Sequence, residues 1–200
     1  MSQHTSPYRG VADRRADSIL IRPALPEDAA QVIAYARGVF AEPGINLITA
    51  PDEFNPTTEA EARMIVEMNR SSNSLFLVAE DDGRIVGQLT LQGGKRRHVR
   101  HAATLGITVA REWRNQGVGR RLMEYAIDWA RAGGGLTRLE LFVFVRNTNA
   151  LHLYESSGFE AARRSPIERY GVGFVGGGGA AAQPAAAARV ARTAARVMGR

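Results

Sequence analysis

The sequence predicts a mixed α/β domain built around one central sheet. Between about Ser18 and Tyr170, short apolar runs alternate with segments of helical periodicity. Two of the apolar runs are joined at Asp82-Gly83, a strong hairpin signal. The chain has 200 residues, 44% of them hydrophobic and 23% charged, as in ordinary soluble proteins that bury a core.

The first half of this body is expected to contain three strands and two helices. Pro26 suits the first turn of a helix, and Glu27 and Asp28 would lie near the positive end of its dipole. In chain order we expect a strand at 19–21, a helix entered at Pro26, a loop over 41–56, a helix at about 58–69, and hairpin strands at 75–79 and 85–91.

The second half is expected to contain two more strands, each followed by a helix. Between residues 117 and 131, apolar side chains recur along one helical stripe, and charged side chains occupy the other face. The run 139–145 is apolar on both alternating faces apart from Glu140, which predicts a central strand buried on both faces. The expected elements are a strand at about 103–109, a helix at 117–131, a strand at 139–145 and a short helix at about 148–156 that ends at Gly158.

Composition divides the chain into three regions. Residues 1–17 are interpreted as a flexible leader because they lack apolar periodicity, and residues 18–170 as the folded domain. Residues 171–200 form a Gly/Ala/Arg-rich, low-complexity tail. We expect residues 185–198 of this tail to be disordered, with a basic helix as the alternative.

Charge and cysteine content exclude several classes of function. The net charge is +6, but four arginines of the tail account for most of it and leave +2 on the rest, which gives no argument for a nucleic-acid partner. The chain has no cysteine, so a disulfide, a zinc–thiolate site and a thiol nucleophile are excluded. No apolar run approaches the ~20 residues of a membrane span, and we expect a cytoplasmic protein.

The segment Arg114-Asn115-Gln116-Gly117-Val118-Gly119 precedes the long amphipathic helix. A helix N-terminus presents unpaired N–H groups and partial positive charge, so it attracts phosphate oxygens. The glycines allow close backbone approach, and Arg114 adds a charged donor. A dinucleotide fingerprint would need glycine where Leu122 stands, and a P-loop would need Lys-Ser/Thr after Gly119.

This segment resembles the R/Q-x-x-G-x-G/A signature of the GCN5-related N-acetyltransferase (GNAT) superfamily. The preceding run Leu105-Gly106-Ile107-Thr108-Val109 resembles the family's fourth strand. Downstream, Asn147-Thr148-Asn149-Ala150-Leu151-His152-Leu153-Tyr154 with Gly158-Phe159 resembles the second hallmark, N-x-x-A-x-x-L-Y-x-x-x-G-F. The resemblance covers about residues 18–160; without it, the glycine segment would be only a turn entering a helix.

The resemblance implies a mixed, mostly antiparallel sheet with helices on both faces, and acetyl-CoA as acyl donor without a metal. It implies direct acetyl transfer to a primary amine, expected to be that of a small molecule. A protein amino terminus or lysine, a non-catalytic acyl-CoA-binding module and a basic-tail interaction protein stay open as alternatives. A homodimer is compatible with the family. No proper seventh strand is visible after Phe159, so the sheet is expected to be incomplete at its C-terminal strands.

The resemblance also assigns roles to residues. Tyr154 is the expected general acid, because a phenol stays protonated at pH 7 and can donate to the departing thiolate. The general base is open between a carboxylate of the 41–56 loop (Glu42, Asp52 or Glu53), His101 and a water chain. The implied cofactor-binding residues are Ile107, Val109, Arg114, Asn115, Gln116, Gly117, Val118, Gly119 and Asn147.

Overall fold

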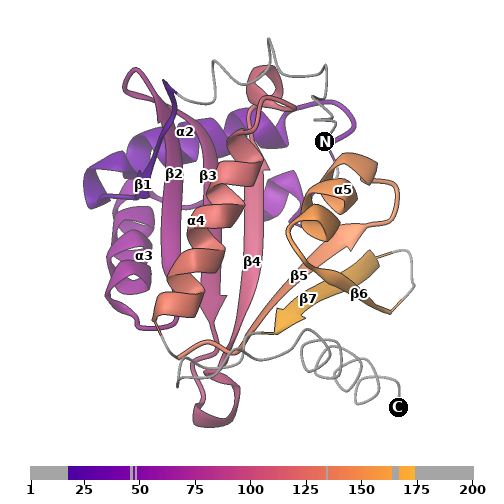
Figure 1. The fold of residues 1–200 in the computed structure, drawn as a ribbon. Helices are drawn as coiled ribbons and strands as arrows, with labels where there is room; N and C mark the ends of the chain where they lie inside the picture. The colour runs from indigo at the N-terminus through magenta and orange to yellow at the C-terminus, as the bar shows by residue number, and fades with distance from the viewer. Residues whose placement is uncertain (1–17, 46, 48, 134, 164–166, 174–200) are drawn as a thin grey trace, which may run out of the picture.

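The computed structural model describes residues 18–173 apart from residues 46, 48, 134 and 164–166 (Figure 1). The expected leader lies outside the described residues, and so does the tail beyond residue 173. No helix in the described part has the length and hydropathy needed to cross a bilayer. The strands are β1 (Leu20–Pro23), β2 (Leu75–Asp81), β3 (Arg84–Gly93), β4 (Ala102–Val109), β5 (Arg138–Phe144), β6 (Glu160–Arg163) and β7 (Ile167–Gly173). The α-helices are α2 (Ala29–Phe40), α3 (Thr58–Arg70), α4 (Val118–Ala132) and α5 (Thr148–Ser156).

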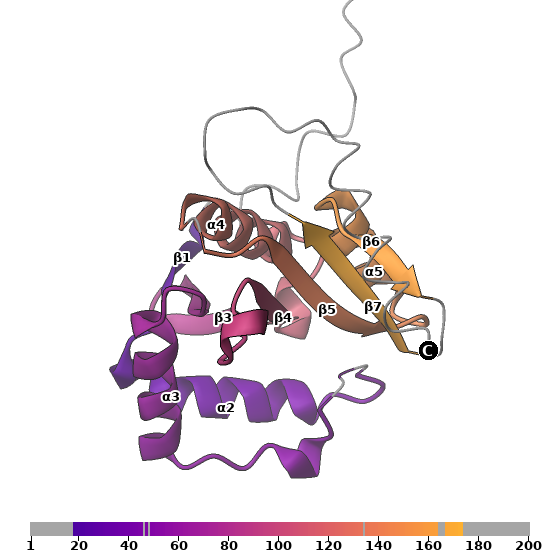
Figure 2. The same cartoon turned by 90° about the horizontal axis from the view of Figure 1, so that it is seen from below.

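The seven strands form one sheet in the order β1-β2-β3-β4-β5-β7-β6. Every neighbouring pair is antiparallel except β4 and β5, which are parallel. The predicted fold class, a mixed and mostly antiparallel sheet with helices on both faces, is therefore confirmed (Figure 2). Most predicted helix and strand bounds agree within a few residues, and Pro26 lies in a short 3₁₀ turn that leads into α2.

The prediction that the sheet lacks a proper seventh strand is wrong. β7 runs between β5 and β6, pairing from Phe144↔Ile167 to Arg138↔Gly173 on one side and with β6 on the other. Backbone hydrogen bonds to two neighbours can hold a segment as a strand even where its sequence has no strong apolar alternation. β7 also continues to Gly173, past the domain boundary expected at residue 170.

Strands β4 and β5 pair over only a short stretch. The register joins Ala102↔Arg138, Ala103↔Leu139 and Thr104↔Glu140, whereas β4 continues to Val109 and β5 to Phe144. Beyond these pairs the two strands diverge, as Figure 1 shows. The divergence leaves one edge of β4 without a neighbouring strand in the middle of the sheet.

The two faces of the sheet are covered differently. On one face α4 packs Leu122, Met123 and Ala126 against all the central strands. On the other face α2 and α3 cover an apolar cluster with Phe76 and Val78 of β2 (Figure 2). That cluster contains no residue of β4 or β5, so this face of the central strands is not closed by the helices.

The prediction that β5 is buried on both faces is wrong for this reason. Leu139, Leu141 and Val143 are buried on the α4 side. Phe142, which points to the other face, is 46% exposed. An apolar side chain on each face was read as double burial, but the face away from α4 opens into a cavity.

Candidate active site

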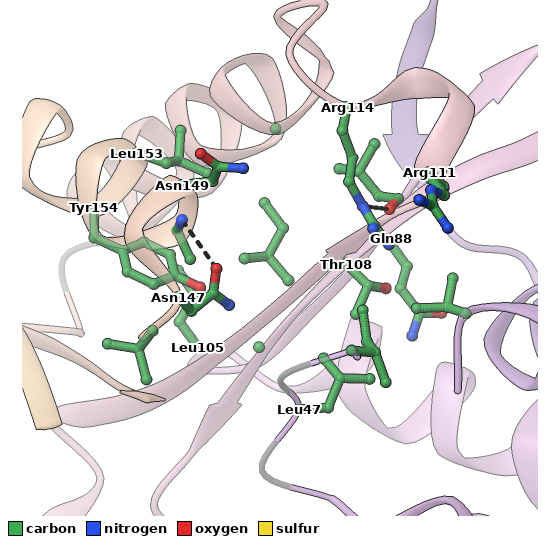
Figure 3. Close-up of a pocket in the computed structure, with 18 of the residues that line it drawn as sticks. Leu47, Gln88, Leu105, Thr108, Arg111, Arg114, Asn147, Asn149, Leu153 and Tyr154 are labelled. Carbon is green, nitrogen blue, oxygen red and sulfur yellow. Dashed lines mark hydrogen bonds between the residues drawn. The ribbon is translucent and has the colours of Figure 1, made fainter. Parts of the chain in front are cut away.

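A cavity of about 1030 Å³ lies where β4 and β5 diverge. Its walls come from the end of α2 and the following loop, from β3, β4 and β5, from the segment before α4, and from α5 (Figure 3). Every residue predicted to bind the cofactor or to act as the acid lines this cavity, with the exception of Val118. Val118 is 1% exposed, and its side chain belongs to the core under α4, so only its backbone can serve a ligand.

The backbone of β4 presents hydrogen-bonding groups to the cavity, of which the Val109 carbonyl accepts from Arg114 Nε. In an antiparallel ladder, alternate residues direct N–H and C=O toward the partner strand. Gly94 N–H donates to the Ala102 carbonyl and Ala110 N–H to the Val86 carbonyl, so the even-numbered residues of β4 face β3. Ile107 and Val109 therefore direct their backbone groups to the side that β5 has left. A ligand in extended conformation could pair there as an added strand would.

The turn before α4 has the backbone geometry of an anion site. Asn115 has φ of 58° and Gly117, the N-cap of α4, has φ of 84°, both in the left-handed region. The first N–H that closes a helical turn here is that of Arg121, which donates to the Gly117 carbonyl. The amides before it point out of the helix end, and left-handed turns of this kind gather such amides into an anion-binding concavity.

Gly119 lies in a tightly packed position at the start of α4. A Cβ at this position would lie 3.2 Å from Leu153 Cδ2 of α5 and 3.8 Å from Val109 Cγ2 of β4. The glycine thus brings the start of α4 close to α5 and β4, and draws three parts of the cavity wall together.

Arg114 lies at the cavity wall and contacts other parts of that wall. Its guanidinium forms an ion pair with Glu42 (Nη2 to Oε2, 2.7 Å), and its Nε donates to the Val109 carbonyl (2.8 Å). Figure 3 shows this second bond from the segment before α4 down to β4. Arg114 therefore braces the loop after α2, the end of β4 and the predicted diphosphate turn against one another.

Tyr154 and Asn147 line the opposite wall (Figure 3). Tyr154, on α5, is 7% exposed and packs against Phe159 with 6.1 Å between ring centroids. Burial raises the pKa of Tyr154 to about 12, so its phenol stays protonated at neutral pH. Asn147 is the N-cap of α5, and its Oδ1 accepts from Ala150 N–H at 3.3 Å. Because Oδ1 serves the helix, the amide NH₂ is the group that Asn147 can offer a ligand.

A polar floor was not predicted from the sequence. It is formed by side chains that β3 and β4 present on the face away from α4. Thr108 opposes Gln88, and its Oγ1 lies 3.1 Å from the Tyr35 hydroxyl of α2. The alternation of polar residues in the second hairpin strand was the available signal. The floor consists of Gln88, Thr90, Gln92, Thr104 and Thr108, with Gly106 between the two threonines of β4.

The structure narrows the choice of general base. Glu42 is the one carboxylate among the described cavity-lining residues, and it is held by Arg114. His101 is exposed, precedes β4 at the far end of the strand and does not line the cavity. Asp52 and Glu53 do not line it either; Glu53 accepts from Ala50 N–H. Within the described ranges, no three or more His, Asp or Glu side chains are grouped as a metal site would require.

Comparison with known proteins relates this chain to acetyltransferases. The model of the acetyltransferase (GNAT) family matches residues 43–159. An L-amino acid N-acetyltransferase of Escherichia coli (strain K12) is 40% identical over 84 residues, which cover 42% of this chain and 52% of that protein. The match thus spans about half the length of this relative.

Solved structures with the same fold are acetyltransferases as well. A GNAT-family acetyltransferase from Streptococcus pneumoniae is 31% identical with a TM-score of 0.72, covering 78% of this chain and 99% of that one. A Salmonella typhimurium protein solved with its cofactor acetyl-CoA shares the fold at 17% identity and a TM-score of 0.69, covering 83% of this chain and 98% of that one. The chain belongs to the GNAT family of acetyltransferases.

Proposed function

We propose that this protein transfers the acetyl group of acetyl-CoA directly to the primary amine of a small molecule. The observation that carries the proposal is the juxtaposition in one cavity of a β4 edge that has no neighbouring strand beyond residue 104, a left-handed turn at the start of α4 and the buried phenol of Tyr154. The strand edge can hold an extended arm, the turn can hold an anion, and the phenol can donate a proton.

The donor site fits acetyl-CoA in shape and in polarity. The backbone groups of Ile107 and Val109 can pair with the amides of a pantetheine arm, and the NH₂ of Asn147 can reach it from α5. The amides from Asn115 to Gly119 can hold a diphosphate. Arg120 and Arg121 also line the cavity and add positive charge beside that turn.

For acetyl transfer, the protein has to orient the thioester and the amine and to supply one proton to the departing sulfur. Bound acetyl-CoA supplies a thioester carbonyl that an amine can attack, with formation of the C–N bond and cleavage of the C–S bond. The Ile107 backbone N–H is suited to donate to the carbonyl oxygen as it gains negative charge. Tyr154 donates its proton to the departing sulfur. Solvent takes the proton that the amine loses.

The acceptor is proposed to be a free amino acid or a similar small amine. The Escherichia coli relative is named for acetylating L-amino acids. A polycationic acceptor would call for several carboxylates, whereas Glu42 is the one among the described lining residues and is already paired with Arg114. A zwitterionic acceptor needs no such cluster.

The test is turnover of acetyl-CoA by the full chain with a panel of amines that includes free L-amino acids, polyamines and a lysine-containing peptide. Release of free thiol reports the reaction, and calorimetry reports acetyl-CoA binding. We expect turnover with amino acids and a large loss in Tyr154→Phe. Acetyl-CoA binding without thiol release with any amine would favour the non-catalytic binding module instead.

Three wider expectations belong to the same proposal. A homodimer is expected by analogy with the family, and light scattering on a size-exclusion column would measure it. The tail is expected to be dispensable, so deletion of residues 176–200 should change neither acetyl-CoA affinity nor turnover. Loss of either on deletion would assign the tail a part in the site.

We expect the protein to act in the cytoplasm, which fluorescence of a tagged full chain would test.

A further inference from the structure

Phe142 exposes an aromatic ring inside the cavity. Of the large apolar side chains that are exposed in the described part of the chain, Phe142 alone lines the cavity, and it is 46% exposed. Val145, which follows the end of β5, is 45% exposed and lies outside the cavity lining. A ligand that covered the Phe142 ring would remove apolar surface from water, which is favourable in proportion to the area covered. The ring is therefore expected to contact a ligand in the cavity.

The register places Phe142 beside the reacting centre of the proposed function. The last pair between the parallel strands β4 and β5 is Thr104↔Glu140, so two residues further along Phe142 is level with Gly106, across the gap between the strands. Both Phe142 and Gly106 line the cavity. Gly106 precedes Ile107, whose N–H is suited to polarise the thioester, and it has no side chain that would fill the space toward Phe142. An acceptor can therefore lie against the Phe142 ring while its amine reaches the thioester.

The loop after α2 adds apolar side chains to the same part of the cavity. This loop follows the helix that covers the face of the sheet away from α4, the face to which Phe142 points. Ile45 and Leu47 of the loop line the cavity with half-buried side chains, and Figure 3 labels Leu47. Glu42 is the one carboxylate among the described lining residues, and Arg114 pairs with it. A group held between this loop and Phe142 thus meets apolar surface and no unpaired carboxylate.

We propose that Phe142, together with Ile45 and Leu47, binds the side chain of the acceptor and selects L-amino acids whose side chains are apolar. This inference rests on the proposed function and specifies its acceptor. The polar floor of the cavity suits the amino and carboxylate groups, and the Phe142 ring suits the side chain. An amide or charged side chain in that place would lose its hydration without gaining a hydrogen-bond partner, so such amino acids are disfavoured.

The test compares L-leucine with L-asparagine, which are similar in size and shape and differ in polarity. We expect wild-type kcat/KM for leucine to exceed that for asparagine roughly 10- to 100-fold, the range for burying one aliphatic side chain. Phe142→Ala should reduce this ratio at least about 5-fold, whereas Phe142→Leu should keep most of it because an apolar surface remains. Acetyl-CoA affinity should stay within about 2-fold in both variants, since the ring is placed on the acceptor side. Val145→Ala removes a similarly exposed side chain outside the cavity and should keep the wild-type ratio.

Three results would overturn the inference. The first is a wild-type ratio near one. The second is an equal fall for leucine and asparagine in Phe142→Ala, because the ring would then shape the site without selecting the side chain. The third is an unchanged ratio with an altered oligomeric state in Phe142→Ala, which would place the ring in an interface between subunits.

Binding separates this inference from the proposed function. Calorimetric titration of leucine and asparagine into the complex with coenzyme A, which has no acetyl group to transfer, measures acceptor binding without turnover. Leucine binding that Phe142→Ala weakens, with no thiol release from acetyl-CoA for any amine, would refute the proposed reaction and leave the Phe142 pocket standing. Thiol release with amines but equal binding of the two amino acids would refute the pocket alone.

Discussion

Arg114 lies between Glu42 and the carbonyl of Val109, with 2.7 Å to the first and 2.8 Å to the second. One guanidinium thereby joins the loop that follows α2, on the acceptor side, to the end of the strand that would hold the donor. The pair is largely shielded, with 34% and 16% of the Arg114 and Glu42 side chains exposed. Substitution of Arg114 or Glu42 should therefore loosen both the loop after α2 and the end of β4.

A double-mutant cycle with Glu42→Gln and Arg114→Gln tests this link. We expect a coupling of about 1 kcal/mol in the free energy of unfolding, since a partly shielded pair should exceed a fully exposed one. Arg84 and Glu112 form an exposed pair at 3.2 Å and serve as the control, with a coupling near zero. Equal couplings for the two pairs would contradict a bracing role for Arg114.

Tyr154→Phe tests the proton donor. We expect kcat to fall roughly 100-fold, the lower end for loss of a general acid, with acetyl-CoA affinity unchanged. Tyr35→Phe, which removes a half-buried phenol that does not line the cavity, is the control and should keep most of the rate. A rate for Tyr154→Phe within a few-fold of the wild type would leave the phenol with a packing role only.

The same tyrosine makes stability depend on pH at the alkaline end. Burial raises the pKa of Tyr154 from 10.0 to about 12, so between these values the unfolded chain loses a proton that the folded chain keeps. The contribution of Tyr154 to the free energy of unfolding is therefore fully present below pH 10. It falls by about 2–3 kcal/mol as the pH rises toward 12. Chemical denaturation at pH 9 and pH 11 should show a smaller loss for Tyr154→Phe than for the wild type; an equal loss would argue against deep burial of the phenol.

Gly117→Ala tests the left-handed turn. At φ of 84° an alanine is strained, and we expect a loss of about 1 kcal/mol in stability together with weaker acetyl-CoA binding. Gly83, with φ of 78° and open space where a Cβ would lie, belongs to the β2–β3 hairpin far from the cavity. Gly83→Ala should cost similar stability and leave binding unchanged. If both variants bound acetyl-CoA equally well, the turn at Gly117 would not be the diphosphate site.

Asn147 caps α5 and is predicted to bind acetyl-CoA as well, and substitution can divide the two. Asn147→Asp keeps an oxygen to cap α5 but removes the NH₂ group, whereas Asn147→Ala removes both. We expect the aspartate variant to keep its melting temperature and to bind acetyl-CoA more weakly, and the alanine variant to lose about 1 kcal/mol of stability as well. Wild-type affinity in the aspartate variant would confine Asn147 to capping.

Local patterns in the sequence predicted the parts of the site that one segment can encode. The glycine turn and helix start at 114–119, and the cap and αL end of α5 at Asn147 and Gly158, each depend on residues a few positions apart, and Gly158 has φ of 87° as expected. These segments do line one cavity, with Val118 facing the core. Their roles toward a ligand stay predictions.

What the sequence did not reveal depends on partners far along the chain. Arg114 was read as a phosphate contact because nothing nearby indicates that Glu42 approaches it. Phe142 was read as buried because periodicity cannot tell how far α2 and α3 extend over a sheet. β7 was missed because two neighbouring strands, more than its own composition, define it.

Because β4 and β5 diverge after three residue pairs, backbone hydrogen bonds between strands are absent from the middle of the sheet. A ligand bound in the gap would supply hydrogen bonds in their place. An occupant that pairs with Ile107 and Val109 would tie the β1–β4 half to the β5–β7 half beyond the contacts at residues 102–104. Saturation at about 100 times the dissociation constant would then add close to 3 kcal/mol to the free energy of unfolding. Amide exchange should slow most along that seam, because there a guest molecule replaces a strand.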